Sequence, residues 1–335
     1  MPRRSRFRRL VLLFAALFLG LGGFAIYAVA TAPQEPAVSR HIDATARDIS
    51  PAFAPFGNAE GLDAPAIDAA FAGVAARLDG TRLVIVPSYL ADGLLLTNRL
   101  GLTDYFASQI AALRAAGFDV ALALVDTEAS VAVNATMLAR LVAADDRPVC
   151  FISHSKGGLD VLQFLIDADA ATRARVACWV ALQAPFHGSP IADLAGGSKA
   201  LRSLTDPLAE WLGGSGQSLT DLTIAVRAPW MADHDGSVRA LVAQTPLLCV
   251  ATRIDTPSLT LPTIYMRPAF DWMQARNIPN DGLVPVPSAV LPGARCVVLA
   301  GLDHADTVAD NPVIDDAGDR LLLLKALLAL ALDAR

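Results

Sequence analysis

The sequence has 335 residues, of which 54% are hydrophobic and 18% charged, enough for one large domain with a well-buried core. Five of the 27 basic residues lie among the first nine positions, and the other 22 face 33 acidic residues. This acidic body argues against nucleic acid or anionic lipid as partners. No CxxC or Cys/His spacing predicts a zinc site.

The first 30 residues predict an export segment. Residues 1–9 form a basic tail, and residues 10–30 contain no charge. As a helix, this run would be about 30 Å long, enough to cross a bilayer core. The arginines keep its start in the cytoplasm. We expect an uncleaved single-pass anchor in the cell inner membrane with the rest of the chain outside. The alternative is a signal peptide cleaved at residues 28–30 or 30–32, which would make the protein secreted.

Residues 31–78 are rich in Ala and Pro and predict a linker and N-terminal extension, with helical spacing over 63–78. In residues 79–335, short apolar runs alternate with helical patterns. This alternation is typical of an α/β domain whose mainly parallel sheet is covered on both faces. We expect strands over 83–86, 120–125, 148–152, 176–181, 247–251 and 296–299, and helices over 103–116, 133–143, 156–166 and 321–332.

Residues 190–246 interrupt this rhythm, because they separate two predicted strands by more than a usual crossover. Their apolar and helix-like pieces predict a cap over a site, and the alternative is an additional helical pair packed at the sheet edge. The four cysteines, Cys150, Cys178, Cys249 and Cys296, each fall in a predicted central strand. An exported protein can form disulfides, but strand interiors favour the interpretation of small buried hydrophobes.

Residues 149–158, Val-Cys-Phe-Ile-Ser-His-Ser-Lys-Gly-Gly, carry the most information about function. A strand runs directly into a helix, with Ser155 at the turn and small residues on both sides. Such a turn exposes the hydroxyl in a strained backbone conformation. The start of the helix offers N–H groups where an oxyanion would form. We therefore predict that Ser155 is a nucleophile, in an S-x-S-x-G pattern with Ser153 at the first position.

A nucleophilic serine needs a base and a carboxylate that orients it. Of the five histidines, His304 follows the last predicted strand, on the sheet edge that carries Ser155, and is the predicted base. His187 and His234 are the alternatives, since His41 lies in the linker and His154 should point away from the site. For the acid, Asp255 follows a predicted strand, and Asp281 lies in an Asn-Asp-Gly turn that we expect to expose its carboxylate; the pattern alone leaves both open.

These residues resemble the lipase and esterase branch of the α/β hydrolases, above all bacterial triacylglycerol lipases and inositol-deacylase-like esterases. Residues 152–158 are similar to the G-H-S-x-G-G block of that family, and residues 184–189 to its T-P-H-x-G-S block. Residues 280–284 are similar to its N-D-G-x-V, and residues 304–306 to its H-x-D. The four blocks occur in the order of the family, over roughly residues 80–310. The resemblance implies an α/β-hydrolase fold and favours Asp281 as the acid.

The resemblance also implies an oxyanion hole. The backbone N–H groups of Tyr89, in the turn Pro87-Ser88-Tyr89, and of Lys156 would be its donors. That turn lacks the His-Gly of the family. The Lys156 side chain should either meet the cap or a substrate acid, or be solvated. Some lipases of the family bind a structural calcium ion between two aspartates, and Asp255 and Asp306 are the candidates for it here.

The expected function is hydrolysis of carboxylic esters through an acyl-enzyme, with a small-molecule or lipid ester as substrate and no organic cofactor. An acyltransferase would have the same sequence features, because only the acyl acceptor differs. A membrane-anchored binding protein that kept the fold without activity is the alternative outside enzymes.

Overall fold

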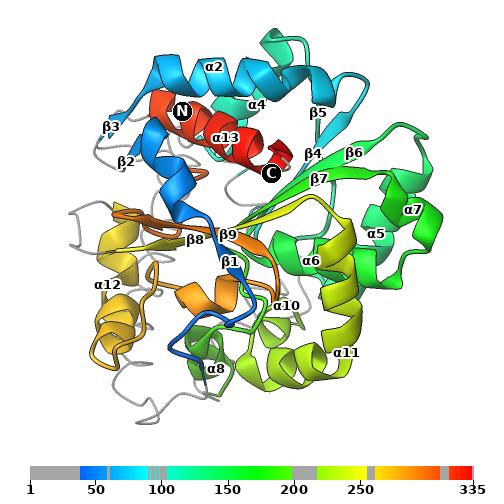
Figure 1. Ribbon diagram of the computed structural model, residues 1–335. Coiled ribbons are helices and arrows are strands. Elements are labelled where there is room, and N and C mark those ends of the chain that lie inside the picture. Colours follow the sequence, from blue (N-terminus) through cyan, green and yellow to red (C-terminus); the bar gives the residue numbers. More distant parts are fainter. Residues whose placement is uncertain are drawn as a thin grey trace, which may run out of the picture.

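A seven-stranded sheet forms the centre of the protein (Figure 1). The computed structural model describes residues 38–58, 61–89, 91, 95, 98, 104–197, 217–254, 261–309 and 317–333. The strands of the sheet are all parallel, in the order β1-β9-β8-β7-β6-β4-β5. Their bounds are Arg47–Asp48 (β1), Arg82–Val86 (β4), Asp119–Leu122 (β5), Val149–His154 (β6), Val176–Leu182 (β7), Leu247–Arg253 (β8) and Arg295–Ala300 (β9). The prediction of a parallel α/β sheet is confirmed.

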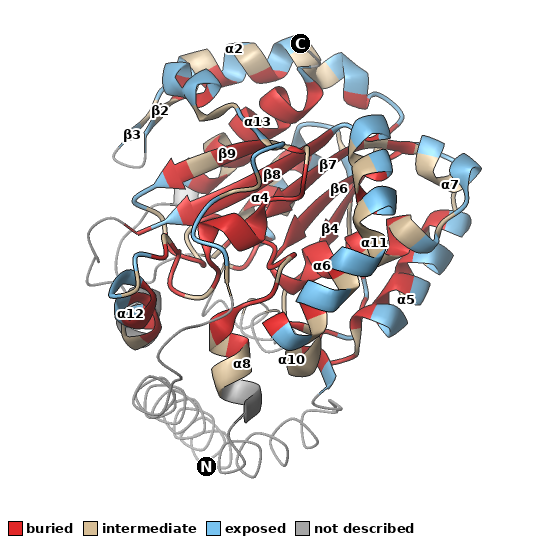
Figure 2. Cartoon of the chain, turned by 60° about the horizontal axis from the view of Figure 1, so that its bottom comes forward, coloured by how far each residue is buried: buried red, intermediate tan, exposed pale blue. Residues whose placement is uncertain are grey.

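Both faces of the sheet are buried, because apolar residues occupy successive positions of each central strand. In β4, Val84 and Val86 enter one core cluster, while Leu83 and Ile85 enter the other. Alternate residues of a strand point to opposite faces, so an uninterrupted apolar run needs a helical layer on each side. Figure 2 shows the central strands buried along most of their length.

Two helical layers cover these faces (Figure 1). On one side lie α4 (Ala107–Ala115) and α13 (Ala317–Leu332), and α2 (Ala64–Ala75) packs on α13. On the other side lie α5 (Val131–Ala143), α6 (Lys156–Asp167) and α11 (Ile224–Gln244). Side chains cap several helix starts: Ser130 Oγ accepts from Val133 N in α5, and Thr223 Oγ1 accepts from Val226 N in α11. The layers thus fix the ends of the strands, where the predicted site residues lie.

The long insertion between β7 and β8 contains α8 (Pro190–Gly197), α10 (Gln217–Asp221) and α11. Helix α11 packs against α6 and buries Met231, Val238 and Leu241 in the same core cluster as that helix. This half of the insertion is therefore a helix of the covering layer. Residues 198–216 lie outside the described residues, so the predicted cap stays a prediction for the first half.

The chain before residue 79 adds β1 to the edge of the sheet beside β9, followed by the 3-10 turn Ser50–Phe56 and a small hairpin of β2 (Gly57–Asn58) and β3 (Gly61–Leu62). Short helical turns occupy 76–78 and 286–289, and two further helices are α7 (Ala170–Ala174) and α12 (Leu261–Gln274). The predicted anchor, residues 10–30, lies outside the described residues. Among the residues that are described, no helix is both long and apolar enough to cross a membrane.

The four cysteines lie in β6, β7, β8 and β9, and all are fully buried. Cys150 and Cys178 face each other across β6 and β7, with Cα atoms 4.5 Å apart, and form a disulfide. Cys249 and Cys296 face each other across β8 and β9 as free thiols, and burial raises the pKa of each to about 12. The interpretation of unpaired buried side chains is thus wrong for the first pair and confirmed for the second.

Candidate active site

Ser155 lies between β6 and α6 with φ of 52° and ψ of −123°. A positive φ is costly for a residue with a Cβ atom and commonly marks a functional turn. The first turn of α6 can approach β4 only because Gly157 has no side chain: a Cβ atom there would lie 2.5 Å from Val86 O and 2.6 Å from Pro87 O. At Gly158 it would lie 2.3 Å from Ala184 Cβ. These two glycines therefore allow the sharp turn that the sequence predicts at Ser155.

Ser153 has a partner that explains its departure from the glycine of the motif. The indole Nε1 of Trp179, in β7, donates to Ser153 Oγ over 2.8 Å, and both residues are fully buried. The serine hydroxyl therefore satisfies a buried donor on the neighbouring strand. Only the position of Trp179 in the fold reveals this reason.

The structure brings His304 and Asp281 together. His304 Nδ1 lies 2.8 Å from Asp281 Oδ2, and the His304 backbone N–H donates to Asp281 O over 3.0 Å. A carboxylate oxygen accepts here, so Nδ1 donates to Asp281 Oδ2, and in a neutral imidazole Nε2 is then the acceptor. This is the tautomer that a general base requires.

Asp281 is itself held by its turn. Its Oδ1 accepts backbone N–H bonds from Leu283 over 3.0 Å and Val284 over 2.7 Å, and the side chain is 1% exposed. The other oxygen, Oδ2, is the one that contacts His304. The carboxylate thus has a fixed orientation toward the imidazole, and the expectation that the turn exposes it is wrong. Asp255, the alternative acid, lies outside the described residues.

The His304 loop also contacts the residue next to Ser155. His154 Nε2 lies 3.0 Å from His304 O, and the two imidazole centroids are 5.0 Å apart. Within the described residues, Ser155 Oγ and His304 Nε2 do not form a hydrogen bond. The structure therefore places the predicted base beside the turn of Ser155 without joining the two side chains.

The other histidines have different surroundings. His234, on α11, stacks on Trp230 with centroids 4.2 Å apart, and its Nδ1 contacts Trp230 O over 2.8 Å. Burial lowers the pKa of His187, whose backbone N–H donates to Ser288 O. His41 is exposed in the N-terminal segment. Within the described residues, His304 is the histidine whose ring has a hydrogen bond to a carboxylate.

The two predicted oxyanion donors lie on adjoining segments. The close approach of Gly157 to Val86 and Pro87 sets the turn that contains Tyr89 against the start of α6. Lys156 is the first residue of that helix, and its backbone N–H has no acceptor among the hydrogen bonds of the described residues. Tyr89 is partly buried and packs on the core.

The Lys156 side chain is buried in an ion pair rather than solvated. It is 1% exposed, and Nζ lies 3.1 Å from Asp160 Oδ1 on the next turn of α6. Asp160 is equally buried and also accepts from Asn134 Nδ2 over 3.0 Å. Burial raises the Asp160 pKa to about 6, against the opposing effect of the Lys156 charge. The interpretation of a solvated lysine is therefore wrong.

Gln183 organises the His304 loop, and sequence reasoning missed it. The Gln183 side chain is fully buried after β7; its Nε2 donates to Asp303 O over 2.8 Å, and its Oε1 accepts from Thr307 Oγ1 over 2.7 Å. Gln183 thus binds both sides of His304. Its own φ of 52° is a feature that the sequence could not reveal.

Asp306, one calcium candidate, takes part in the same loop. Its Oδ2 accepts from Asp303 N over 2.6 Å, while Asp303 Oδ1 accepts from Asp306 N over 3.0 Å. The second candidate, Asp255, lies outside the described residues. Within those that are described, no group of three or more His, Cys, Asp or Glu side chains could hold a metal ion. The calcium site stays a prediction.

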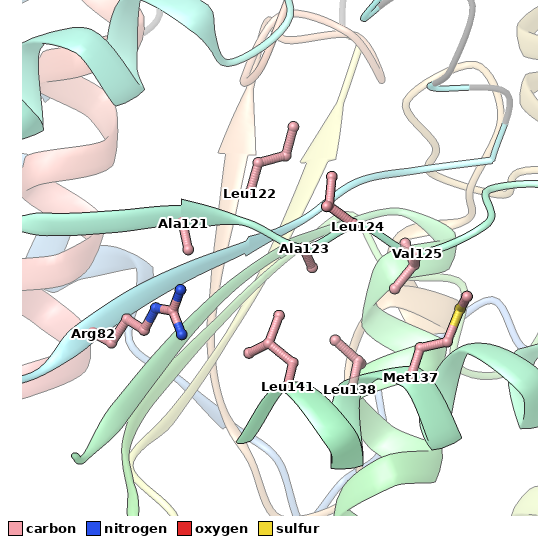
Figure 3. A pocket seen from close by; sticks show the side chains of 9 residues that line it. All are labelled: Arg82, Ala121, Leu122, Ala123, Leu124, Val125, Met137, Leu138 and Leu141. Atoms are coloured by element: carbon pink, nitrogen blue, oxygen red, sulfur yellow. The ribbon is translucent and has the colours of Figure 1, made fainter. Parts of the chain in front are cut away.

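A hollow of about 250 Å³ lies away from these residues, between the edge strand β5 and α5 (Figure 3). Its wall is mainly aliphatic, and Leu124 beside it is 86% exposed. The lining residues are Arg82, Ala121, Leu122, Ala123, Leu124, Val125, Met137, Leu138 and Leu141. None of them belongs to the predicted site.

Comparison with known proteins gives a likeness in structure alone. No protein-family model and no curated protein matches the sequence. A metagenomic carboxyl esterase has 23% identity and a TM-score of 0.58, over 75% of each chain. The mature lipase BlEst2 of Bacillus licheniformis has 22% identity and a TM-score of 0.50, over 67% of this chain and 84% of the other. The chain therefore has an α/β-hydrolase fold, related by structure, at low sequence identity, to a carboxyl esterase and a bacterial lipase.

Proposed function

We propose that this protein is a serine hydrolase of carboxylic esters in which Ser155 is the nucleophile, His304 the base and Asp281 the orienting acid. The observation that carries the proposal is the 2.8 Å contact between His304 Nδ1 and Asp281 Oδ2, on a loop that is hydrogen-bonded to the residue beside Ser155. A strained serine before a helix and an oriented neutral imidazole are the parts that nucleophilic acyl transfer needs. Solved structures with the same fold include a carboxyl esterase and a lipase.

In the first step, Ser155 Oγ attacks the ester carbonyl carbon while His304 Nε2 takes the hydroxyl proton. The tetrahedral intermediate collapses as the bond to the alcohol breaks, and His304 returns the proton to the leaving oxygen. Water then attacks the acyl-enzyme with His304 again as base. The carboxylic acid product leaves, and the Ser155 hydroxyl is restored. Asp281 stabilises the imidazolium in both steps. The Ser155–His304 hydrogen bond forms with substrate bound, since such bonds are often long in free enzymes.

The oxyanion is stabilised by the backbone N–H groups of Tyr89 and Lys156. The Lys156 N–H belongs to the first turn of α6, where the helix dipole also favours negative charge. The ion pair with Asp160 holds the Lys156 side chain away from this position. The substrate is a small-molecule or lipid ester, and the N-terminal segment anchors the enzyme to the outer side of the inner membrane.

Labelling and hydrolysis together test the proposal. The full chain, purified in detergent, should react with a fluorophosphonate probe at Ser155 and should hydrolyse p-nitrophenyl acyl esters. Ser155→Ala should lose labelling and at least about 10⁴-fold in kcat, as expected when a nucleophile is removed. His304→Asn should lose activity to a similar extent, whereas the matched control His234→Asn should keep it.

The outcomes separate the alternatives. Activity that survives Ser155→Ala would exclude this site. A folded wild-type chain that neither reacts with the probe nor hydrolyses any ester would favour a binding protein. Acyl transfer to an added alcohol that outruns hydrolysis would identify an acyltransferase with the same nucleophile.

A further inference from the structure

His154 has no part in the proposed chemistry, yet its imidazole is 4% exposed and lies among three aromatic rings. It is the last residue of β6, so its side chain points to the opposite face of the sheet from that of Ser153. There it contacts the His304 loop on one side and Tyr105 on the other. Both ring nitrogens have partners.

Three hydrogen bonds form one chain through this histidine. His154 Nε2 lies 3.0 Å from His304 O, and His154 Nδ1 lies 3.2 Å from the Tyr105 hydroxyl. Ser88 N donates to the same hydroxyl over 2.8 Å. The chain therefore runs from the loop of the proposed base, past the turn of Ser155, to the oxyanion turn at Pro87-Ser88-Tyr89.

The partners allow only one direction for these bonds. The His304 carbonyl can only accept, so His154 Nε2 must donate, and in a neutral imidazole Nδ1 then accepts from the Tyr105 hydroxyl. The hydroxyl in turn accepts from Ser88 N. Burial lowers the pKa of His154 well below its usual value and raises the pKa of Tyr105, so both groups stay neutral. The titratable groups that face His154 are Tyr105 and His304.

Tyr105 is also fixed at its backbone. It pairs with Ala309 as an isolated antiparallel bridge, and Phe106 N donates to Val308 O over 2.8 Å. Asn98 contacts the Tyr105 main chain through two hydrogen bonds of 2.8 and 2.9 Å. The hydroxyl therefore belongs to a segment that is itself attached to the chain just after His304.

We propose that His154 and Tyr105 are positioning residues, which hold the His304 loop and the oxyanion turn at a fixed separation across Ser155 through the Ser88–Tyr105–His154–His304 chain of hydrogen bonds. This inference rests on the proposed function, because it assigns the two ends of the chain to the base and the oxyanion hole. Neither residue touches the substrate. Their loss should therefore lower kcat and leave KM unchanged.

Tyr105→Phe removes the hydroxyl and keeps the ring. We expect kcat to fall by about 10- to 100-fold, in the range that a misplacement of about 1 Å causes. The midpoint of the pH profile of kcat/KM should not move, because His154 does not titrate in that range. His154→Phe should lose at least as much, and His154→Gln should recover part of it, since its amide can still donate to His304 O.

The matched control is Phe151→Leu, on the same strand but on the other face of the sheet, where it packs on Phe164. This variant should lower the melting temperature and leave kcat within about twofold of wild type. If it lowers kcat as much as Tyr105→Phe does, general loosening explains the effect and the inference fails. Should Tyr105→Phe not fold, the comparison of Gln and Phe at position 154 decides.

A second measurement does not depend on activity. Nitrogen-15 NMR of labelled histidines, assigned with His154→Gln, should show His154 as a neutral ring protonated at Nε2 from pH 5 to 9. A titrating ring or the other tautomer would overturn the inference. If wild type does not react with the probe at Ser155, the proposed function fails, and this spectrum alone judges the chain of hydrogen bonds. If wild type is active and Tyr105→Phe is unchanged, only the further inference fails.

Discussion

At Ser153, the side chain that departs from the lipase motif accepts the hydrogen bond of a fully buried indole. Replacing it by the glycine of the motif would leave Trp179 Nε1 without an acceptor. We expect Ser153→Gly to lower the free energy of unfolding by about 1–3 kcal/mol, the cost of a buried unsatisfied donor. Urea denaturation would measure the change.

The Trp179→Phe variant supplies the control background, because phenylalanine has no N–H group that could lose its acceptor. There the same Ser153→Gly change should cost much less, and the double-mutant cycle should give a coupling energy clearly above zero. Equal costs in the two backgrounds would show that the hydrogen bond has no bearing on stability.

Lys156 and Asp160 form a buried ion pair one helical turn apart, directly behind Ser155. Removing one partner leaves the other charge buried without compensation, which costs roughly 3–5 kcal/mol. We therefore expect Asp160→Ala to lower the free energy of unfolding by about that amount. The apolar double variant Lys156→Met with Asp160→Leu should be close to wild type or more stable. A single variant as stable as wild type would contradict this account.

The Lys156–Asp160 pair also predicts that the free energy of unfolding depends on pH. The folded pKa of Asp160, about 6, lies above its ordinary value of 3.8, so the folded chain holds a proton between these values that the unfolded chain has lost. The contribution of Asp160 to stability is therefore full below pH 4 and declines as the pH rises to 6. The free energy of unfolding of the double variant, relative to wild type, should increase from pH 4 to 6. A difference between the double variant and wild type that stays constant from pH 4 to 6 would contradict this prediction.

Between β6 and β7, the Cys150–Cys178 disulfide closes a sequence separation of 28 residues within the central sheet. When the chain is unfolded in guanidinium without reductant, iodoacetamide should modify two cysteines, Cys249 and Cys296. After reduction it should modify all four, as peptide mass spectrometry would show. Four modified cysteines before reduction would refute the disulfide.

Cys150→Ala is the matched variant for this count. It should expose three thiols, with Cys178 as the added one. It should also lose about 3–4 kcal/mol of stability, the entropy that a loop of this length removes from the unfolded chain.

The elements that the sequence predicted well are those with uniform patterns. Strands β4 to β9 coincide within a few residues with the six predicted apolar runs, because a strand buried on both faces needs an unbroken run. The sequence does not predict helix α12, because Pro268 interrupts its pattern. Strand β1 has only two residues, and it exists through its pairing with β9. Helix α11 lies in the segment predicted as a cap, because sequence does not show which surface an inserted helix covers.

At the scale of the whole molecule, the ends of the parallel strands predict His304 on the sheet edge of Ser155, and the resemblance to the lipase family favours Asp281 over Asp255 as its partner. Asp281 and His304 are 23 positions apart in sequence and form a 2.8 Å contact. What the sequence could not predict are the contacts of buried polar groups. The sequence neighbours of Gln183, Asp160 and Tyr105 are ordinary. Gln183 and Tyr105 have hydrogen-bond partners in distant parts of the chain, and Asp160 pairs with Lys156 on a buried face of one helix.

The packing of α13 has a consequence for the order in which the protein is made. This helix follows every strand in the chain, yet it fills the face of the sheet on which Cys150 and Cys178 lie, and α2, from before β4, packs over it. While the chain is being synthesised, α13 cannot cover its part of that face until residue 332 has emerged. We expect thiol oxidants to reach the two sulfurs most readily during this interval. Once α13 has docked, reductants reach them only when the helix comes away.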